Sequence, residues 1–444
     1  MAKTNGIMTG WLIVSANEAK KGHGLVIENG VITDIVPNEK LLGKEGVIDA
    51  RENIVCPTFA STHTHMYETL AHGAVEPNLS LKPLLEEFWW PVVENRQNLE
   101  TIRISAEYAS MEHLKTGVTL INDILEAPFA ENGKRLLTEE KALRRAGMKG
   151  VLSLESNERI STANGEENLK ENADFILAMR DRGNADIRGT ICTHTTFSCS
   201  VPFLKKASGM ARAIDEYIQI HMNEGPDECK CCYDQYGMTT AELYKKIGFW
   251  EGGKAWANQC SCMEPVELNI MGSMGVGIST QPRSNALCNA GIAPVSDMLK
   301  NGILVGLGTD NGEGNFFENM RYLALMQMGK NYTKYALSPL QAFEIATEMG
   351  AKGLGYTNVG TLRKGYSADF QVLSGDAAIY LQEHNVVQEV FWRKEPQDIK
   401  AAYVNGEIVA SGGRAVNLDE ERIRREFRDC VRDFWKGQPY QIGE

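Results

Sequence analysis

Between residues 54 and 308, eight short apolar segments alternate with longer amphipathic segments, and this alternation is the strongest constraint on the fold. The apolar segments occupy residues 54–62, 118–124, 151–154, 187–193, 218–221, 255–260, 276–280 and 303–308. Strands that alternate with helices are typical of a parallel sheet, and eight such units suggest a (β/α)8 barrel. We therefore predict an α/β fold with a TIM-like barrel over residues 57–365, whose active site lies at the carboxyl ends of the strands.

The two ends of the chain have a different, β-rich pattern. Asn29-Gly30 and Asn405-Gly406 each separate two β-rich runs, which is a strong hairpin signal. We predict that residues 1–56 and 366–444 share one small β domain. Apolar residues at helical spacing near the end, such as Ile423 and Phe427, add a packed C-terminal helix to it. Within the barrel, Ser338 before Pro339 predicts the start of a helix that runs to about residue 354.

The charge of the chain excludes some classes of partner. Its 46 Lys and Arg residues against 58 Asp and Glu residues give a net charge of -12, which disfavours nucleic acid and anionic membrane surfaces. The sequence contains no apolar stretch of the roughly 20 residues that a membrane span requires, and no signal-like start. We expect a cytoplasmic protein whose ten cysteines are free thiols or metal ligands rather than a disulfide framework.

Four candidate metal ligands follow three of the predicted strands. Side chains two residues apart on a strand point to the same side, so His63 and His65 can bind one ion. His221 follows the fifth predicted strand and Asp310 the eighth, at the same end of the barrel. Three imidazoles and one carboxylate suit Zn²⁺ or Fe²⁺, with a position left for water. We predict one catalytic divalent metal, Zn²⁺ in preference to Fe²⁺; taken singly, His221 or Asp310 would fit packing or capping.

Two further polar residues lie near the same strand ends. Glu224, three residues after His221, is placed to move a proton to a leaving group or ring nitrogen, unless it is an exposed loop acid. His194 follows the fourth predicted strand, where it could donate to a substrate nitrogen or carbonyl or simply line the wall. Asp310 has a possible second role as acceptor of a proton from the attacking water.

The order of these motifs resembles the amidohydrolase superfamily, in particular the branch of ATZ/TRZ triazine hydrolases, guanine deaminases and SsnA-like aminohydrolases. The resemblance covers nearly the whole chain and rests on Ile48-Asp49-Ala50, Thr62-His63-Thr64-His65, Gly117-Val118-Thr119, His194-Thr195-Thr196-Phe197-Ser198, His221-Met222-Asn223-Glu224, Arg283-Ser284-Asn285 and Gly306-Leu307-Gly308-Thr309-Asp310-Asn311. It implies that the metal ligands are His63, His65, His221 and Asp310, that Glu224 is the proton shuttle, and that His194 and Asn285 contact substrate.

One position departs from the family pattern. Where the family usually has a histidine after the sixth strand, this chain has Gln259, or Asn258 or Cys260 if the placement shifts by one residue. Glutamine can hydrogen-bond a hydroxide or a carbonyl, but it cannot take up a proton near pH 7. We therefore expect Gln259 to act in the site, with turnover that is slow, altered or absent.

Two other sequence features concern the mouth of the barrel. Trp89 and Trp90, after the first strand, could stack on a flat substrate or could equally be core residues. Five cysteines follow strands five and six and could hold a second metal or an iron–sulfur cluster, although their spacing matches no standard signature; these are Cys229, Cys231, Cys232, Cys260 and Cys262.

From these observations we predict a metal-dependent aminohydrolase. It would release ammonia from a purine, pterin, pyrimidine or triazine after attack by a metal-activated hydroxide. The alternatives are hydrolysis of a cyclic amide or of another C–N or C–Cl bond at the same site, or a silent family member that binds a ligand or partner because of Gln259. The resemblance also implies that the domain of residues 1–56 and 366–444 is a composite β-sandwich, and that the protein is a homo-oligomer, such as a dimer.

Overall fold

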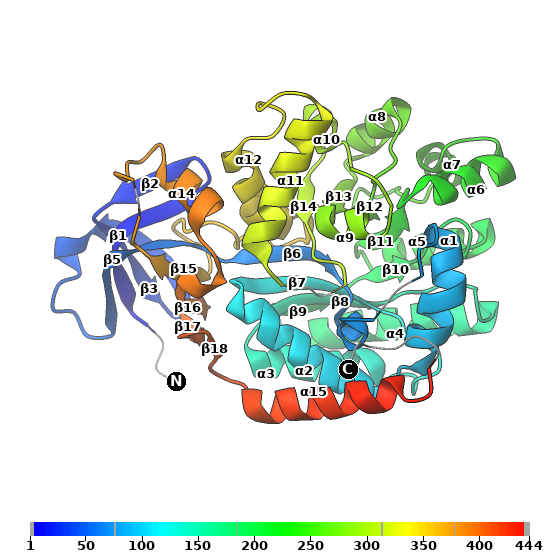
Figure 1. Cartoon of the computed structure of the whole chain (residues 1–444), viewed down its shortest axis with the longest axis horizontal. Helices are drawn as coiled ribbons and strands as arrows, with labels where there is room; N and C mark the ends of the chain where they lie inside the picture. The colour runs from blue at the N-terminus through cyan, green and yellow to red at the C-terminus, as the bar shows by residue number, and fades with distance from the viewer. Residues whose placement is uncertain (1–3, 75–76, 184, 312–313, 378, 439–444) are drawn as a thin grey trace.

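The computed structural model describes residues 4–74, 77–183, 185–311, 314–377 and 379–438. Figure 1 shows two parts side by side: a barrel surrounded by helices and a smaller β domain that contains residues from both ends of the chain. Each part has one nine-stranded sheet. In the described residues no helix is long and apolar enough to cross a membrane.

The barrel sheet is parallel and closes around its own axis. Its order is β10-β11-β12-β13-β14-β6-β7-β8-β9. The strands are β6 (Phe59–Thr64), β7 (Val118–Leu125), β8 (Lys149–Leu154), β9 (Ile187–Gly189), β10 (Ile191–Thr193), β11 (Ile218–Met222), β12 (Ala255–Gln259), β13 (Gly277–Thr280) and β14 (Val305–Leu307). Because β9 and β10 are one strand interrupted at Thr190, the nine segments amount to eight barrel strands. The predicted (β/α)8 fold is confirmed.

Helices surround the barrel in the expected alternation. They are α2 (Leu99–Lys115), α3 (Arg135–Ala146), α4 (Thr162–Asp181), α5 (Val201–Ala213), α6 (Pro226–Tyr236), α7 (Thr240–Ile247), α8 (Pro265–Met274), α9 (Pro282–Leu287), α10 (Val295–Lys300), α11 (Phe316–Lys330), α12 (Pro339–Glu344) and α13 (Gly350–Gly353). The side chain of Ser338 caps α12 by accepting a hydrogen bond from the backbone N–H of Gln341. The side chain of Gln341 in turn accepts one from the backbone N–H of Ser338. The helix predicted to reach residue 354 continues from α12 through a π-helical segment, η5 (Ile345–Met349), into α13.

The first predicted strand is divided between the two sheets. Residues 54–57 end strand β5 (Val47–Pro57), which belongs to the small domain, and the barrel strand β6 starts only at Phe59. Both halves of the run are buried. The predicted first strand, residues 54–62, therefore spans the change of sheet at Thr58.

The small domain is a mixed sheet that joins both ends of the chain. Its strands are β1 (Gly6–Ser15), β2 (Glu18–Lys21), β3 (His23–Glu28), β4 (Val31–Pro37), β5, β15 (Phe370–Ser374), β16 (Ile399–Val404), β17 (Glu407–Ser411) and β18 (Arg414–Ala415). β5 pairs with β15, so the N-terminal and C-terminal segments meet in the middle of the sheet. Asn29 and Gly30 both have positive φ, as the predicted tight hairpin between β3 and β4 requires. Three short helices lie between these strands in the sequence: η1 (Asn38–Lys40), α14 (Val386–Arg393) and η6 (Pro396–Asp398).

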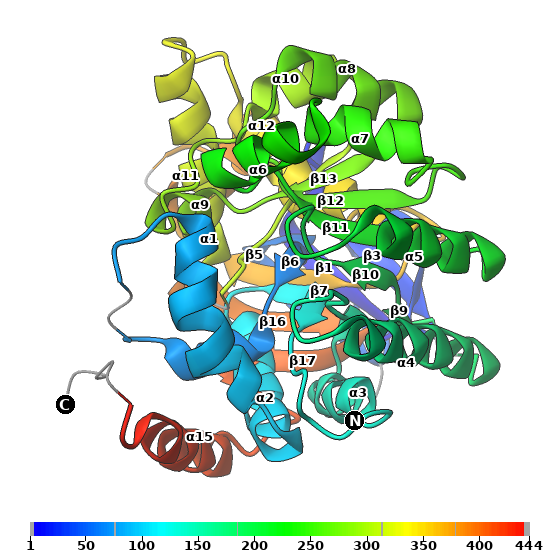
Figure 2. The same ribbon diagram turned by 90° about the vertical axis from the view of Figure 1, so that its right-hand side faces the viewer.

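The chain after β6 covers the carboxyl ends of the barrel strands. This covering segment consists of η2 (Met66–Ala71), α1 (Leu81–Leu84), the π-helix η3 (Leu85–Val93) and η4 (Glu94–Arg96). Figure 2 looks toward that end of the barrel, and α1 stands in front of it.

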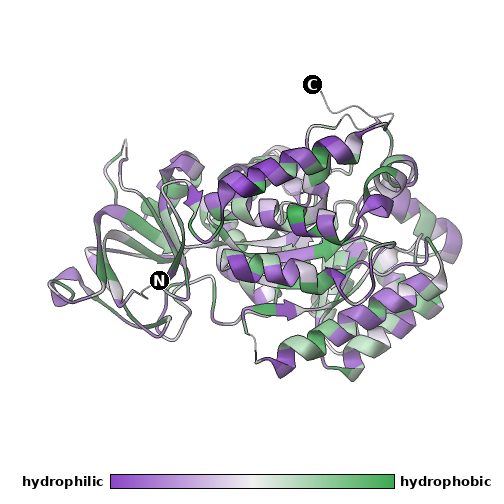
Figure 3. Ribbon diagram, turned by 90° about the horizontal axis from the view of Figure 1, so that it is seen from below, coloured by the Kyte–Doolittle hydropathy of each residue, from purple (hydrophilic) through white to green (hydrophobic). Residues whose placement is uncertain are grey.

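The C-terminal helix α15 (Glu420–Trp435) lies along α2, and Figure 3 shows many hydrophilic residues on it, as expected of a helix at the surface. Its apolar side packs inward, with Phe427 stacked on Tyr108 at a ring distance of 3.7 Å. The indole Nε1 of Trp435 donates a hydrogen bond of 2.7 Å to the carbonyl oxygen of Leu70. The last described helix is thereby fastened to η2 in the covering segment.

Candidate metal centre and active site

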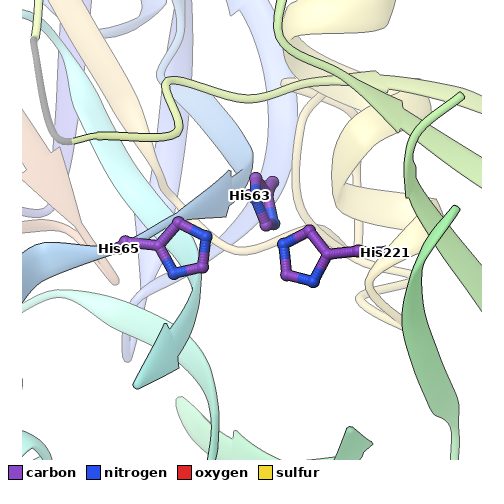
Figure 4. Close-up of side chains that lie close together, drawn as sticks. All are labelled: His63, His65 and His221. Atoms are coloured by element: carbon purple, nitrogen blue, oxygen red, sulfur yellow. The ribbon is translucent and has the colours of Figure 1, made fainter. Parts of the chain in front are cut away.

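Three histidine side chains converge at the carboxyl end of the barrel (Figure 4). His63 lies on β6 and His65 directly after it, while His221 comes from β11 on the opposite side of the group. All three are buried, and one nitrogen of each lies within 4.8 Å of the others. Alternation along β6 brings the first two imidazoles to the same side, as the sequence predicts.

The carboxylate of Asp310 lies next to this group. Its Oδ1 atom is 3.0 Å from His63 Nε2 and 3.5 Å from His65 Nε2. Ligand atoms about 2.0–2.1 Å from a tetrahedral zinc ion are roughly 3.3 Å apart, so the spacing of these atoms fits one such ion. The residues present therefore fit a divalent metal held by His63, His65, His221 and Asp310.

Hydrogen bonds and burial prepare the imidazoles as ligands. His65 Nδ1 donates a 2.7 Å hydrogen bond to the carbonyl oxygen of Ile124, which leaves Nε2 with its lone pair toward the site. Burial, followed by the charge of His63, lowers the pKa of His65 to about 4. Burial also lowers the pKa of His221 well below its ordinary value. Both rings are therefore neutral at pH 7, the state that binds a metal.

Asp310 is held by two neighbours on its other oxygen. Oδ2 accepts hydrogen bonds from Ser284 Oγ at 2.5 Å and from Gln259 Nε2 at 3.1 Å. Burial alone would raise the pKa of Asp310, but the hydrogen bond and charge of His63, with smaller contributions from His65 and Ser284, hold it below its usual range. Gln259 and Asp310 both have positive φ, a strained conformation that recurs at functional sites.

Glu224 is only partly exposed and faces the same cavity as Asp310. Burial raises the pKa of its carboxyl well above the ordinary value, and the charges of Asp310 and Glu228 raise it further. A carboxyl that keeps its proton at neutral pH can act as a general acid.

Glu155 directly follows β8 and lies between two histidines. Its Oε1 is 3.5 Å from His194 Nε2, and its Oε2 is 3.5 Å from His221 Nδ1. The ring of His194 is fixed on its other side by Ser198 Oγ, 2.6 Å from Nδ1. Burial, then the charge of Arg159, lowers the pKa of His194 to about 3. His194 therefore meets a ligand as a neutral imidazole with Glu155 beside it.

The cavity above the candidate metal ligands is small. Its volume is about 50 Å³, and its walls include Trp89, Leu85, His194 and Gln259. Pockets that bind drug-sized ligands are roughly 300–1,000 Å³, so a heterocycle with a substituent requires the covering segment to move. Trp90 does not line this cavity but lies over the guanidinium of Arg159, at 5.3 Å. Asn285 is buried on α9 and is not part of the described wall.

Comparison with known proteins places this architecture in a family. Residues 54–409 match the model of the amidohydrolase family. The chain belongs to this family. The match extends from the end of β5 through the whole barrel to β17 and includes every candidate metal ligand. This amidohydrolase is therefore a metal-dependent hydrolase of carbon–nitrogen bonds, as the sequence predicts.

Relatives and solved structures agree with this membership. The amidohydrolase is 29% identical over 408 residues to a 5-methylthioadenosine/S-adenosylhomocysteine deaminase of Carboxydothermus hydrogenoformans, covering 90% of this chain and 92% of the relative. It is 30% identical over 423 residues to a 5'-deoxyadenosine deaminase of Methanosarcina acetivorans, covering 94% and 95%. The crystal structure of an adenosine deaminase of Xanthomonas campestris with bound zinc superposes with a TM-score of 0.87 at 18% identity, covering 97% and 99%.

Two residues that contact the site, Glu155 and Ser284, are not among the site residues that the sequence predicts. Glu155 directly follows β8, at the same end of the barrel as His221 near the end of β11 and Asp310 after β14, and this location at a strand end is the sequence signal that could have found it. Ser284 stands in the Arg283-Ser284-Asn285 motif, but nothing in that motif indicates that its hydroxyl holds Asp310.

The cysteines of this amidohydrolase lie near the site without forming a metal cluster in the described residues. The groups of three ligand atoms found there contain no cysteine. Cys229 Sγ donates to the carbonyl oxygen of Cys262 at 3.4 Å, whereas Cys232 Sγ contacts the carbonyl oxygen of Met238. Cys260 is fully buried. The thiols of Cys229 and Cys262 interact with each other, and this interaction lowers the pKa of Cys262 to about 7, whereas Cys232 has another partner.

Proposed function

We propose that this amidohydrolase is an aminohydrolase that releases the exocyclic amino group of a 6-aminopurine nucleoside as ammonia. The observation that carries the proposal is the buried ligand set of His63, His65, His221 and Asp310, with the proton-holding carboxyl of Glu224 at the same cavity. The names of the relatives, deaminases of 5'-deoxyadenosine and of methylthioadenosine or S-adenosylhomocysteine, support this substrate class.

The chemistry assigns a role to each group of the chain. When bound, the metal supplies a water-derived nucleophile at neutral pH. Glu224 delivers its proton to the ring nitrogen beside the carbon under attack, which makes that carbon electron-poor. Asp310, which is ionised at neutral pH, takes up the proton of the attacking water. The proton held by Asp310 then passes to the exocyclic amino group, which leaves as ammonia. The new hydroxyl group gives its proton back to Glu224, so the product is the 6-oxo heterocycle and both carboxyl groups return to their starting states.

Gln259 and His194 orient rather than transfer protons. Gln259 uses Nε2 to hold Asp310, and its amide does not ionise near pH 7. His194, neutral and fixed by Ser198, is positioned to hydrogen-bond the substrate together with Glu155. Trp89 supplies an apolar wall that suits a flat heterocycle. We propose that Trp90 and Asn285, which do not line the cavity, pack behind the residues that form its wall.

The test is ammonia release by zinc-loaded protein from a panel of heterocycles. The panel contains 5'-deoxyadenosine, methylthioadenosine, S-adenosylhomocysteine, guanine, a pterin and an aminotriazine. Turnover of the adenine nucleosides that Glu224→Gln abolishes, without loss of zinc, supports the proposal. Absence of ammonia from every member, in a protein that holds its zinc, contradicts it. A product heavier by one water without ammonia would instead indicate hydrolysis of a cyclic amide.

We also propose an oligomeric state, a cellular location and a possible second metal site for this amidohydrolase. We propose a homodimer, which light scattering on the purified protein tests. We propose a cytoplasmic location, which cell fractionation tests. A second metal bound by Cys229 and Cys262 would appear as metal above one equivalent per chain that Cys262→Ser removes.

A further inference from the structure

We propose that Cys229 and Cys262 form a redox-active dithiol, which a hydroperoxide converts into an intramolecular disulfide. Cys229 lies in the first turn of α6, and Cys262 lies in the loop of residues 260–264 between β12 and α8. These two segments directly follow Glu224 and Gln259 in the chain. The inference adds a modification site beside the active site and does not depend on which substrate the enzyme takes.

Hydrogen bonds hold the two segments together around the thiols. The backbone N–H groups of Ser261 and Cys262 donate to the carbonyl oxygen of Asn223, at 3.0 and 3.1 Å. The hydroxyl of Ser261 donates to the carbonyl oxygen of Glu224 at 3.0 Å. Cys229 Sγ lies 3.4 Å from the carbonyl oxygen of Cys262, and the two thiol groups also hydrogen-bond each other. The two sulfur atoms are therefore neighbours on segments whose backbones are already joined.

The two thiols differ in acidity, as the steps of such an oxidation require. The hydrogen bond from Cys229, with smaller contributions from Ser261 and Lys330, lowers the pKa of Cys262 to about 7 against the opposing effect of burial. About half of Cys262 is therefore thiolate at neutral pH, and the thiolate is the nucleophilic form. The same hydrogen bond, followed by burial, raises the pKa of Cys229, so this thiol keeps its proton.

The pair combines acidity with access. Cys229 and Cys262 are both partly exposed, so a small peroxide can reach them. Outside this pair, the thiols with a shifted pKa in the described residues have it raised, with burial as the first cause; they are Cys56, Cys192, Cys199, Cys231, Cys232, Cys260 and Cys430. Among these cysteines and the pair, oxidation should therefore begin at Cys262.

Oxidation of the pair consumes one molecule of hydrogen peroxide. The Cys262 thiolate attacks one peroxide oxygen, the O–O bond breaks, and the departing hydroxide takes up the proton that Cys262 had released. The product at Cys262 is a sulfenic acid. The sulfur of Cys229 then attacks the sulfur of Cys262, so that an S–S bond forms, the S–O bond breaks, and the proton of Cys229 leaves with the hydroxide as water. Two thiols are oxidised to one disulfide, and the peroxide is reduced to two molecules of water.

The disulfide would fix one side of the mouth of the barrel. It would tie the loop after β12 to α6, and α6 in turn contacts α1 of the covering segment, as Figure 2 shows. The two cysteines are 33 positions apart in the chain, so the bond would remove freedom mainly from the unfolded state. We expect the midpoint of urea unfolding to rise on oxidation and to return after reduction.

A metal ion is the competing partner of these thiols. A structural zinc ion is held by four ligands, and the pair supplies two. The groups of three candidate ligand atoms found in the described part of the chain contain no cysteine. Two neighbouring thiols without a third ligand fit a disulfide better than a metal site, so we favour the disulfide.

The deciding measurement is peptide mass spectrometry of the zinc-loaded protein after treatment with hydrogen peroxide. We expect a linked pair of peptides joined through Cys229 and Cys262, which dithiothreitol separates. Cleavage after Lys230 distinguishes Cys229 from Cys231. Cys262→Ser should abolish the link, whereas Cys231→Ser, the same change at a partly exposed thiol of the same helix, should keep it. In Cys229→Ser the oxidation should stop at the sulfenic acid of Cys262, which dimedone traps.

Each outcome supports or overturns the inference. Peptides that stay unlinked, or a link that persists in Cys262→Ser, overturn it. So does the release of a metal ion on oxidation that Cys262→Ser does not show, because the thiols would then belong to a metal site. If Cys262→Ser does not fold, the dimedone adduct in Cys229→Ser decides. Ammonia release is measured separately: a disulfide in a protein without deaminase activity leaves the inference standing and the proposed function wrong, and activity without a disulfide gives the reverse result.

Discussion

The amide nitrogen of Gln259 donates a hydrogen bond of 3.1 Å to Oδ2 of Asp310, the oxygen that does not face the histidines. The residue that departs from the family pattern therefore supports a candidate metal ligand. It holds the carboxylate from the side opposite to His63, together with Ser284.

Replacing Gln259 with leucine should therefore weaken catalysis without emptying the metal site. Loss of one hydrogen bond to a charged group corresponds to about 10- to 100-fold in kcat/KM. Gln259→His should keep the hydrogen bond to Asp310 and add a group that titrates, so the pH profile of kcat/KM should gain a limb near the pKa of that histidine. An unchanged activity in Gln259→Leu would show that the hydrogen bond does not matter.

Metal content is the most direct check of the ligand set. Protein purified without chelators and away from oxygen should carry about one zinc per chain, measured by mass spectrometry of the metal. Asp310→Ala and His221→Ala should lose it, while Asp227→Ala, in the first turn of α6, should not. Retention of zinc in both ligand variants would place the metal elsewhere.

The raised pKa of Glu224 predicts how activity depends on pH. Because burial and the charge of Asp310 keep the carboxyl protonated, kcat/KM should stay high through neutral pH and fall as the pH rises through that elevated pKa. Glu224→Gln should retain zinc and lose about 10²- to 10⁴-fold in kcat. If the residual activity of Glu224→Gln still falls at alkaline pH as in the unchanged protein, the titrating group is not Glu224.

Glu94 predicts a pH dependence of stability in the metal-free protein. Burial raises its pKa from the ordinary 4.5 to about 8. The folded state then holds a proton that the unfolded state releases between these values, so the free energy of unfolding should fall as the pH rises from about 5 to 8. Glu94→Gln should flatten this decline and add about 1 kcal/mol or more at pH 8. Urea unfolding at several pH values measures both effects, with Glu39→Gln as the matched control.

Much of the barrel and the metal site could be predicted because their signals are local. A candidate ligand at the carboxyl end of an apolar strand can be recognised in His221 and in Asp310 without any knowledge of strand pairing. The roles of Glu155 and Ser284 depend on contacts between different strands and helices, and these contacts leave no pattern along the chain. The division of the first strand at Thr58 is likewise not evident from the sequence, because the residues on both sides of it are buried and extended.

The hydrogen bond from Trp435 to Leu70 has a consequence for the order in which the protein matures. His63 and His65 are synthesised early, but the loop that follows them receives its last support only when Trp435 has been made. Asp310, too, is added when most of the chain already exists. A ribosome-bound chain can therefore display the two histidines long before it can close the site around them, and stable metal loading must wait for nearly complete synthesis.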